Sequence, residues 1–379
     1  MTTSGNDQAD LYPAGRLAAA AAATRAAGLD ALLLTPGPDL RYLTGYDAHQ
    51  LERLTCLVLP AEGAGGEPVL LVPNLEFPAA QASPAGGLGL EIIGWDETDD
   101  PYALVAGQLG HRAAAVGLSD RMWALMVLRL RAALPDTGQE LASLALRELR
   151  ARKSTPEIAA LRAAGEAIDR VHRRVPGWLR PGRTELEVAA DISDAIVEEG
   201  HARADFAIVA SGPNAASPHH APAGRVLQPG DVVVVDIGGT MPSGYCSDCT
   251  RTYAIGSPPP EFAEYYGVLQ AAQEAACAAV RPGVTAEAID AAARTPITAA
   301  GYGQFFMHRT GHGIGLETHE DPYIVSGNAE TLVAGHAFSV EPGIYPGPHG
   351  ARIEDIVVCT EHGFSRLNNV PHDLVVADA

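Results

Sequence analysis

The fold of the C-terminal half is decided by one stretch, residues 232–252, which reads VVVVDIGGTMPSGYCSDCTRT. The four valines predict a buried strand, and the Gly, Pro and Ser residues that follow predict a turn into a second strand. Two strands joined in this way would bring Asp236 and Asp248 to one end of a hairpin. A carboxylate on a buried strand is costly unless it is paired or bound to a metal ion. The stretch therefore indicates either a metal site or two aspartates that cap the turn.

Three later segments supply further candidate ligands. His312 lies in the glycine-rich stretch TGHGIG, where the lack of side chains lets the backbone approach a ligand closely. Glu341 opens the segment EPGIY, and Glu354 lies in RIEDI. With the two aspartates, these residues make four carboxylates and one imidazole. Such a donor set suits paired Mn²⁺, Co²⁺ or Zn²⁺ ions that share bridging carboxylates.

These five segments resemble, in their order and local sequence, the pita-bread peptidase family, whose members include methionine aminopeptidase, aminopeptidase P, prolidase and creatinase. The resemblance covers about residues 154–370. The segment RYLTGY at 41–46 resembles the extra N-terminal domain of the prolidase, aminopeptidase P and creatinase branch. The resemblance implies an α/β N-terminal domain of the creatinase, RNase H-like type over residues 1–150. It implies an α+β pita-bread catalytic domain over residues 151–379.

The resemblance also implies a role for each candidate ligand. Asp236 would chelate one metal through both oxygens, and His312 and Glu341 would complete the shell of the second metal. Asp248 and Glu354 would bridge the pair. A hydroxide held between the two cations would attack the peptide carbonyl, and Glu341 would accept and shuttle the proton. The implied reaction is hydrolysis of Xaa-Pro bonds in small peptides, with Mn²⁺ as the expected metal and Co²⁺ or Zn²⁺ as alternatives.

Five further residues match catalytic or substrate-binding positions of the family. His219 matches the histidine that contacts the substrate, and His319 matches the one that steadies the oxygen of the tetrahedral intermediate. His308 and Phe206 match residues that line the proline pocket. Arg352 matches an arginine that shapes the primed side, where the part of the substrate after the cleaved bond binds.

Three details of these motifs leave room for other interpretations. His220 directly follows His219, so the substrate-contacting histidine is assigned by its place after Pro218. The two aspartates lie twelve positions apart, one more than is common in the family hairpin, which leaves the shape of the turn open rather than the ligands. Cys246 and Cys249 form a Cys-x-x-Cys pair, but no second pair exists to complete a zinc site, and strand alternation would direct them to opposite faces.

The rest of the sequence predicts an α/β segment followed by paired helices and strands. In the first segment, Ala-rich helical stretches alternate with short apolar runs, which is typical of an α/β domain. These runs are Ala31–Leu34, Leu54–Leu59, Pro68–Val72 and Glu91–Ile93. At Ser154, a capping hydroxyl, a proline and Glu157 predict the start of a long helix and a domain boundary. Beyond it we expect, in a coarse two-fold repeat, helices over 184–199, 261–280 and 286–300 and strands over 206–210 and 232–237.

Composition narrows the class of protein and its partners. The chain has 379 residues, 47% hydrophobic and 19% charged, so two folded domains are expected. Acidic residues outnumber basic ones by 46 to 26, and the net charge of -20 would repel nucleic acid. Arg25 and Asp30 interrupt the apolar stretch 17–34 and no basic leader precedes it, so neither a membrane span nor a secretory signal is expected. Five scattered cysteines suit a cytoplasmic protein.

The sequence thus predicts a metal-dependent Xaa-Pro dipeptidase of the prolidase type, acting on proline-containing di- or oligopeptides. An aminopeptidase P that trims longer peptides is the main alternative, because no residue in the motifs separates the two. The complete ligand set argues against a metal-free creatinase-like hydrolase and against a non-catalytic pita-bread binding module. The resemblance also implies a homodimer.

Overall fold

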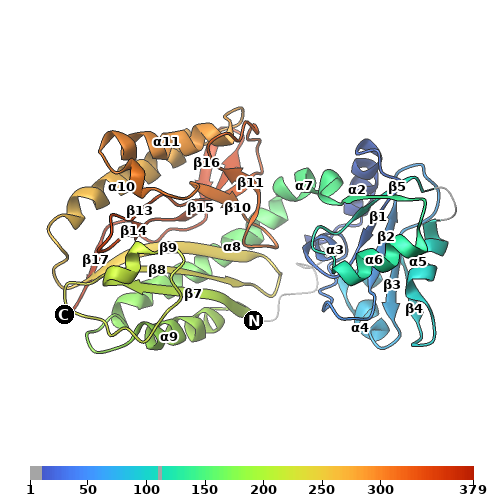
Figure 1. The fold of residues 1–379 in the computed structure, drawn as a ribbon, viewed down its shortest axis with the longest axis horizontal. Helices are drawn as coiled ribbons and strands as arrows, with labels where there is room; N and C mark the ends of the chain where they lie inside the picture. Colours follow the sequence, from blue (N-terminus) through green and yellow to red (C-terminus); the bar gives the residue numbers. More distant parts are fainter. Residues whose placement is uncertain (1–10, 110–112) are drawn as a thin grey trace. The chain divides into compact units, whose positions relative to one another are not determined.

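The structure, a computed structural model, describes residues 11–109 and 113–379 (Figure 1). The chain divides into two compact units, one ending at Arg150 and the other comprising Ala151–Ala379. All five cysteines are buried free thiols. Within the described residues, no helix combines the length and the apolar composition that a bilayer crossing requires.

The N-terminal unit is built around a six-stranded mixed sheet in the order β4-β3-β2-β1-β5-β6. Its strands are β1 (Ala31–Leu34), β2 (Cys56–Pro60), β3 (Val69–Pro73), β4 (Glu91–Trp95), β5 (Ala115–Leu118) and β6 (Gly138–Leu141). Its helices are α2 (Gly15–Ala26), α3 (Pro38–Thr44), α4 (Phe77–Ala82), α5 (Pro101–Leu109), α6 (Ala124–Ala133) and α7 (Ser143–Ala151). Tyr102 and Val105 of α5 and Met126 and Leu130 of α6 pack on one face of this sheet. The four apolar runs of the sequence correspond to β1 to β4, and the α/β class is confirmed.

The second unit begins with the long helix α8 (Thr155–Arg174), which starts where the sequence predicts. Ser154 and Glu157 form a capping box, in which the Ser154 backbone N–H donates to Glu157 Oε2 at 2.9 Å. The other oxygen of Glu157 accepts a hydrogen bond of 2.8 Å from the hydroxyl of Tyr245. The cap therefore also anchors the turn of the hairpin that carries the first two candidate ligands.

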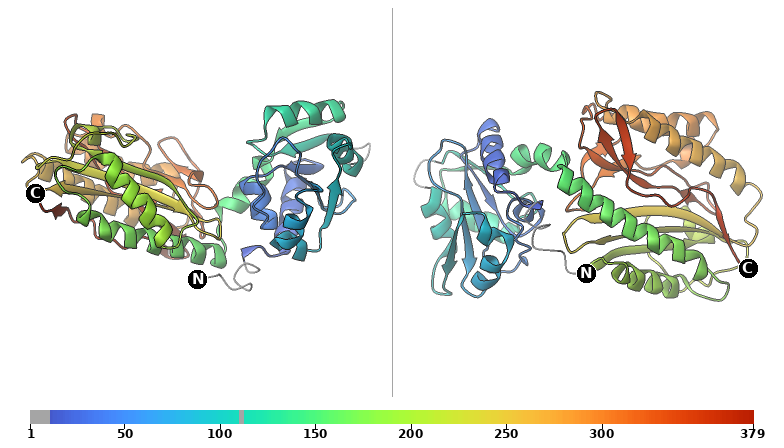
Figure 2. Two further views of the ribbon diagram at one scale, coloured as in Figure 1. Left: turned by 90° about the horizontal axis from the view of Figure 1, so that it is seen from below. Right: turned by 180° about the vertical axis from the view of Figure 1, so that it is seen from behind.

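A four-stranded sheet in the order β17-β9-β8-β7 forms the first half of this unit. Its strands are β7 (Arg203–Ser211), β8 (Val232–Thr240), β9 (Cys246–Ile255) and β17 (Val375–Ala377). Helices α8 and α9 (Glu185–Glu198) cover one face of the sheet, and Figure 2 shows both lying along it.

The β8–β9 hairpin places both aspartates on the face away from these helices, since the alternate residues Val235, Ile237 and Cys249 pack under α8 and α9. Asp236 lies opposite Thr250 and Asp248 opposite Gly238, so the two carboxylates are diagonal neighbours. The hairpin is confirmed, but its aspartates lie within it rather than at one end. The reason is that β8 continues through both glycines to its end at residue 240.

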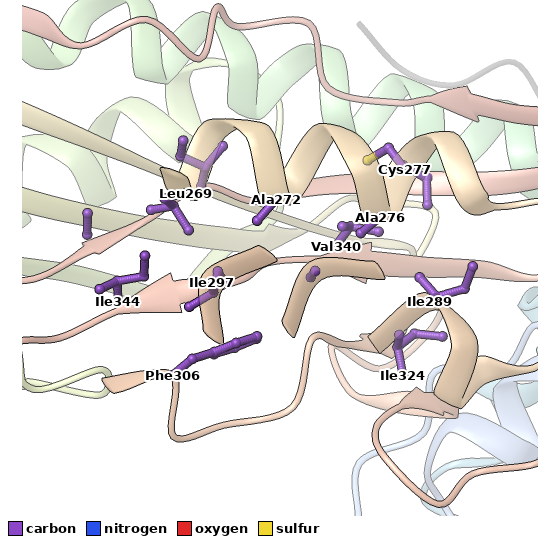
Figure 3. Packing of buried hydrophobic residues seen from close by; sticks show 14 of the residues in the cluster. Leu269, Ala272, Ala276, Cys277, Ile289, Ile297, Phe306, Ile324, Val340 and Ile344 are labelled. Atoms are coloured by element: carbon purple, nitrogen blue, oxygen red, sulfur yellow. The ribbon is translucent and has the colours of Figure 1, made fainter. Parts of the chain in front are cut away.

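The second half of the unit again has two helices over an antiparallel sheet, here in the order β11-β10-β12-β15-β16. The strands are β10 (Gly311–Gly313), β11 (Glu320–Ile324), β12 (Ala337–Val340), β15 (Asp355–Thr360) and β16 (Gly363–Arg366), with β13 (Gly343–Ile344) and β14 (Ala351–Arg352) forming a separate pair. Leu269 and Ala276 of α10 (Phe262–Ala279) share one buried cluster with Ile289 and Ile297 of α11 (Ala286–Ala299) and with Val340 (Figure 3). The two halves together make the α+β pita-bread unit.

Candidate metal centre and substrate cavity

One cavity of about 640 Å³ in the second unit gathers the residues predicted for the site. All ten predicted residues line it, namely Phe206, His219, Asp236, Asp248, His308, His312, His319, Glu341, Arg352 and Glu354. The cavity wall also contains Ile208, Pro218, Arg309 and Thr318. Side chains that lie up to 148 positions apart in the sequence therefore face one space.

The five candidate ligands converge from both sheets. Asp236 and Asp248 come from the β8–β9 hairpin, and His312 comes from β10. Glu341 directly follows β12 and Glu354 directly precedes β15. His312 Nε2 lies 3.2 Å from Glu341 Oε1 and 3.6 Å from Asp248 Oδ2. Candidate donor atoms of Asp248, His312 and Glu354 all lie within 4.8 Å of one another.

Local hydrogen bonds orient His312 toward the carboxylates. Its Nδ1 lies 3.0 Å from the carbonyl oxygen of Gly313, which can only accept, so Nδ1 carries the proton and Nε2 faces the cluster. The Ser339 hydroxyl accepts from the His312 backbone N–H and donates to Glu341 Oε1, each at 3.0 Å. Gly311 is required beside this histidine, because a Cβ there would overlap the carbonyl of Ser339.

The positive charge around the four candidate carboxylates is too small to balance their negative charge. Burial raises the pKa values of Asp248 and Glu354 well above their usual range, and repulsion between the carboxylates adds to the effect. Asp236 Oδ1 and Glu354 Oε1 are buried without a hydrogen-bond partner. Buried charges and unpaired oxygens of this kind are stabilised by coordination to cations. The residues present therefore fit divalent metal ions with oxygen and imidazole ligands.

Arg352 is a buried cation that pairs with one carboxylate of this cluster and reaches a second through Thr250. It is 2% exposed, and its Nη2 pairs with Asp236 Oδ2 at 2.5 Å. Its Nε donates to Thr250 Oγ1 at 3.0 Å, and that hydroxyl donates to Glu354 Oε2 at 2.7 Å. Its Nη1 donates to the hydroxyl of Tyr345 at 2.8 Å. Arg352 thus fixes two ligands at once, one directly and the other through Thr250.

The chain of hydrogen bonds continues from Arg352 into the cavity wall. The Tyr345 hydroxyl lies 3.0 Å from His308 Nε2, and His308 Nδ1 lies 2.8 Å from the carbonyl of Arg309. Because that carbonyl only accepts, His308 Nδ1 carries its proton and Nε2 accepts from Tyr345. Burial lowers the pKa of His308, so the imidazole is held neutral in this orientation.

The structure separates the two adjacent histidines at 219 and 220. His219 is exposed and lines the cavity, whereas His220 Nε2 lies 2.9 Å from Glu185 Oε2, away from it. Glu185 is fully buried at the start of α9 and accepts hydrogen bonds from one loop. The other donors are the backbone N–H of Ser211 and of Ala223 and the side chains of Ser211 and Asn214. His219 is therefore presented by a loop whose base is fixed on Glu185.

His319 packs against His312. Its ring lies edge-on to that of His312, with centroids 4.2 Å apart and an interplanar angle of 79°. Burial, together with the charges of His312 and Arg309, lowers the pKa of His319 to about 4. A neutral imidazole at the rim of the cavity can donate to an oxygen that becomes negative during a reaction.

Sequence reasoning missed three residues whose hydrogen bonds position the candidate ligands or Arg352. Thr250 and Ser339 each lie two positions from a ligand on the same strand or its extension, so strand alternation would have placed them on the ligand face. Tyr345 ends the segment EPGIY that Glu341 opens. The Cys-x-x-Cys pair has no metal role in this geometry, since Cys249 packs under α8 and α9 and burial raises the pKa of Cys246 to about 11.

A buried set of acidic residues and one histidine, on the floor of a cavity in a pita-bread fold, defines a metallohydrolase. The chain belongs to metallopeptidase family M24, whose sequence profile matches residues 159–361. A second profile, described as the creatinase/prolidase N-terminal domain, matches residues 16–152. The chain is therefore a peptidase that uses divalent metal ions.

Relatives cover nearly the whole chain. A "Probable dipeptidase PepE" of Mycobacterium tuberculosis is 56% identical over 369 residues, which are 97% of each chain. An Xaa-Pro dipeptidase of Lactobacillus delbrueckii subsp. lactis is 36% identical, over 92% of this chain and 95% of the relative. The crystal structure of dipeptidase PepE from Mycobacterium ulcerans superposes with a TM-score of 0.91 at 57% identity, covering 97% of this chain and 98% of that one.

Proposed function

We propose that this protein is a dinuclear Xaa-Pro dipeptidase of the prolidase type. The observation that carries the proposal is the complete acidic cluster with two unpaired buried oxygens on the floor of a cavity large enough for a dipeptide. The relatives named dipeptidase and Xaa-Pro dipeptidase support the same substrate class.

In this proposal the cluster holds two divalent ions, most readily Mn²⁺, with Co²⁺ and Zn²⁺ as alternatives. Asp236 would hold one ion, His312 and Glu341 would hold the other, and Asp248 and Glu354 would contribute to both. When bound, two such cations lower the pKa of a water between them toward neutrality and polarise the carbonyl of the scissile bond. In such an oxygen-rich site the choice of metal depends on availability as much as on affinity.

The surrounding residues bind the peptide and move its proton. Glu341, oriented by Ser339, takes a proton and delivers it to the leaving proline nitrogen. His319 donates to the oxygen of the tetrahedral intermediate, and His219 contacts the substrate from its loop. The wall formed by Phe206 and His308 accommodates the proline ring, while Arg352 holds the ligands and shapes the primed side.

We also propose that residues 1–150 and 151–379 are the N-terminal and catalytic domains of a cytoplasmic homodimer. The two profile matches, over 16–152 and 159–361, support this division. Light scattering after size exclusion tests the assembly: a particle of twice the chain mass is expected, and a monomer that retains full activity would contradict the dimer.

The activity is tested with chelator-stripped protein restored with Mn²⁺ and assayed on Ala-Pro, Ala-Ala and Ala-Pro-Ala. We expect metal-dependent cleavage of Ala-Pro and little of Ala-Ala. Asp248→Ala is the control and should be inactive with every substrate. Preferred cleavage of Ala-Pro-Ala would favour the aminopeptidase P alternative, and an unchanged rate after chelation would favour a metal-free hydrolase.

A further inference from the structure

A peptidase that prefers dipeptides has to recognise a free α-carboxylate next to the proline. That negative charge is costly to bury without a counter-charge, and arginine is the side chain best suited to pair with it. Two arginines, Arg309 and Arg352, line the cavity. Their surroundings differ in a way that decides which one is available.

Arg352 is already committed to the protein. Its hydrogen bonds to Thr250, Tyr345, Asp236 and the carbonyl of Pro218 account for four of its five N–H groups. It is buried, and moving it toward a substrate would leave Asp236 without its partner. Binding the carboxylate of a substrate therefore cannot be the main function of Arg352.

Arg309 has no such commitment. No carboxylate in residues 11–109 and 113–379 forms an ion pair with its guanidinium, and the side chain is half-buried in the cavity wall. Its Cζ lies 4.5 Å from the ring centroid of Tyr323 on β11, so the aromatic face supports the guanidinium. Stacking of this kind restricts the side chain while its N–H groups remain free to donate.

The position of Arg309 also suits the primed side. It directly follows His308, which we assign to the proline pocket, and its carbonyl fixes the His308 ring. Arg309 also lines the same cavity as His319, which we assign to the intermediate's oxygen. The guanidinium therefore lies near the residues that surround the proline half of a bound substrate.

We infer that Arg309, held against Tyr323, binds the free α-carboxylate of the dipeptide and so sets the preference for dipeptides over longer peptides. This inference rests on the proposed Xaa-Pro peptidase function. In a longer peptide the same position holds a neutral amide, which leaves the Arg309 charge unpaired.

The test compares Ala-Pro with its C-terminal amide, Ala-Pro-NH₂, on Mn²⁺-loaded wild-type and Arg309→Gln protein. Loss of a charge-assisted pair should raise KM for Ala-Pro by about 10- to 100-fold with kcat little changed. The KM for the amide should change by less than about threefold, because the amide offers no negative charge. Arg309→Lys should restore part of the affinity for Ala-Pro, and Tyr323→Leu should give an intermediate KM.

Arg180→Gln, at an exposed arginine that is not part of the cavity lining, is the matched control and should leave both KM values unchanged. Equal losses on the two substrates would show that Arg309 is only structural and overturn the inference. Unchanged KM values for both substrates in Arg309→Gln would overturn it as well. In either case the wild type would still cleave Ala-Pro, so the proposed function would stand. A Mn²⁺-loaded wild type that cleaves neither substrate would refute the proposed function, and the Arg309 assignment with it.

Discussion

Glu354 and Asp355 are neighbours in the sequence and are buried to the same degree, at 1% and 0% exposure, yet their surroundings are opposite. Asp355 lies 2.7 Å from Arg251 Nη2, 2.8 Å from His372 Nε2 and 3.2 Å from Arg366 Nε. Burial alone would raise its pKa, but Arg251 first and then His372 hold the pKa of Asp355 at about 2. Glu354 instead faces other carboxylates, and its pKa is raised.

The difference between the two residues lies in their counter-charges, not in their burial. Adjacent residues in an extended chain point to opposite sides, so one carboxylate enters the cavity and the other enters a network of cations. Burial is common to both. Missing counter-charge is found only at Glu354, whose Oε1 has no partner. This contrast supports the proposal that Glu354 belongs to the metal centre, whereas Asp355 is paired with cations of the fold.

The largest effect is expected for Glu354→Gln. Removing a ligand shared by two metals should lower kcat/KM by at least about 1,000-fold, since metal polarisation contributes several kcal/mol to catalysis. In chelator, the free energy of unfolding should stay equal or rise, because one of the repelling charges is gone. Rates on Ala-Pro and urea unfolding in chelator measure the two quantities. A loss of activity below about tenfold would remove Glu354 from the site.

Asp355→Asn should show the reverse pattern. It leaves Arg251, whose side chain is 3% exposed, buried without its main counter-charge. We expect a loss of about 3–5 kcal/mol in the free energy of unfolding by urea. The folded variant should keep more metal-dependent activity than Glu354→Gln. A stability change under about 1 kcal/mol would mean that the network around Asp355 contributes little.

Glu185 is a third buried carboxylate, and like Asp355 it is paired with groups of the protein. The variant Glu185→Gln therefore tests a carboxylate that orders a loop rather than one proposed to bind metal. Gln cannot accept as many hydrogen bonds, so the loop that presents His219 should become less ordered. We expect kcat/KM for Ala-Pro to fall by about tenfold, corresponding to about 1.4 kcal/mol, while the amount of bound Mn²⁺ stays the same. Reduced metal content in this variant would contradict a role limited to the loop.

His172 is a buried titratable residue outside the candidate metal centre, and its expected effect near neutral pH is the smallest of the four. Burial lowers its pKa to about 3, with a further contribution from Arg251, whereas the unfolded chain titrates near the ordinary value of 6.5. Between these pH values the unfolded chain binds a proton that the folded chain does not, so stability falls as the pH falls from about 6.5 toward 3. The contribution is at most about 1.4 kcal/mol per pH unit and is smaller just below pH 6.5. Unfolding curves for His172→Gln should lack this part of the slope; an unchanged slope would contradict the assignment.

Much of this molecule could be predicted from sequence because its signals are local. The capping box at Ser154, the four apolar runs of the first unit and the hairpin with two aspartates each lie within a few residues. The predicted end of β8 was wrong because a glycine pair such as Gly238–Gly239 is typical of a turn. In the structure Gly238 lies within the strand, where the ring of Phe206 from β7 occupies the space that a side chain would need. Thr250, Ser339 and Tyr345 each have at least one partner elsewhere in the sequence, namely Glu354 for Thr250, His312 for Ser339 and His308 for Tyr345. Whether Arg309 or Arg352 is already paired with a carboxylate likewise depends on the tertiary fold, which brings Asp236 to Arg352.

The central claim, that the cluster around Glu354 is a two-metal site, is tested most directly by calorimetric titration of chelator-stripped protein with Mn²⁺. We expect two ions to bind per chain in the wild type and fewer in Asp248→Asn, while Asp355→Asn keeps both sites. A wild type that binds no Mn²⁺, or binds it equally well without Asp248, would contradict the assignment of this cluster as the metal centre.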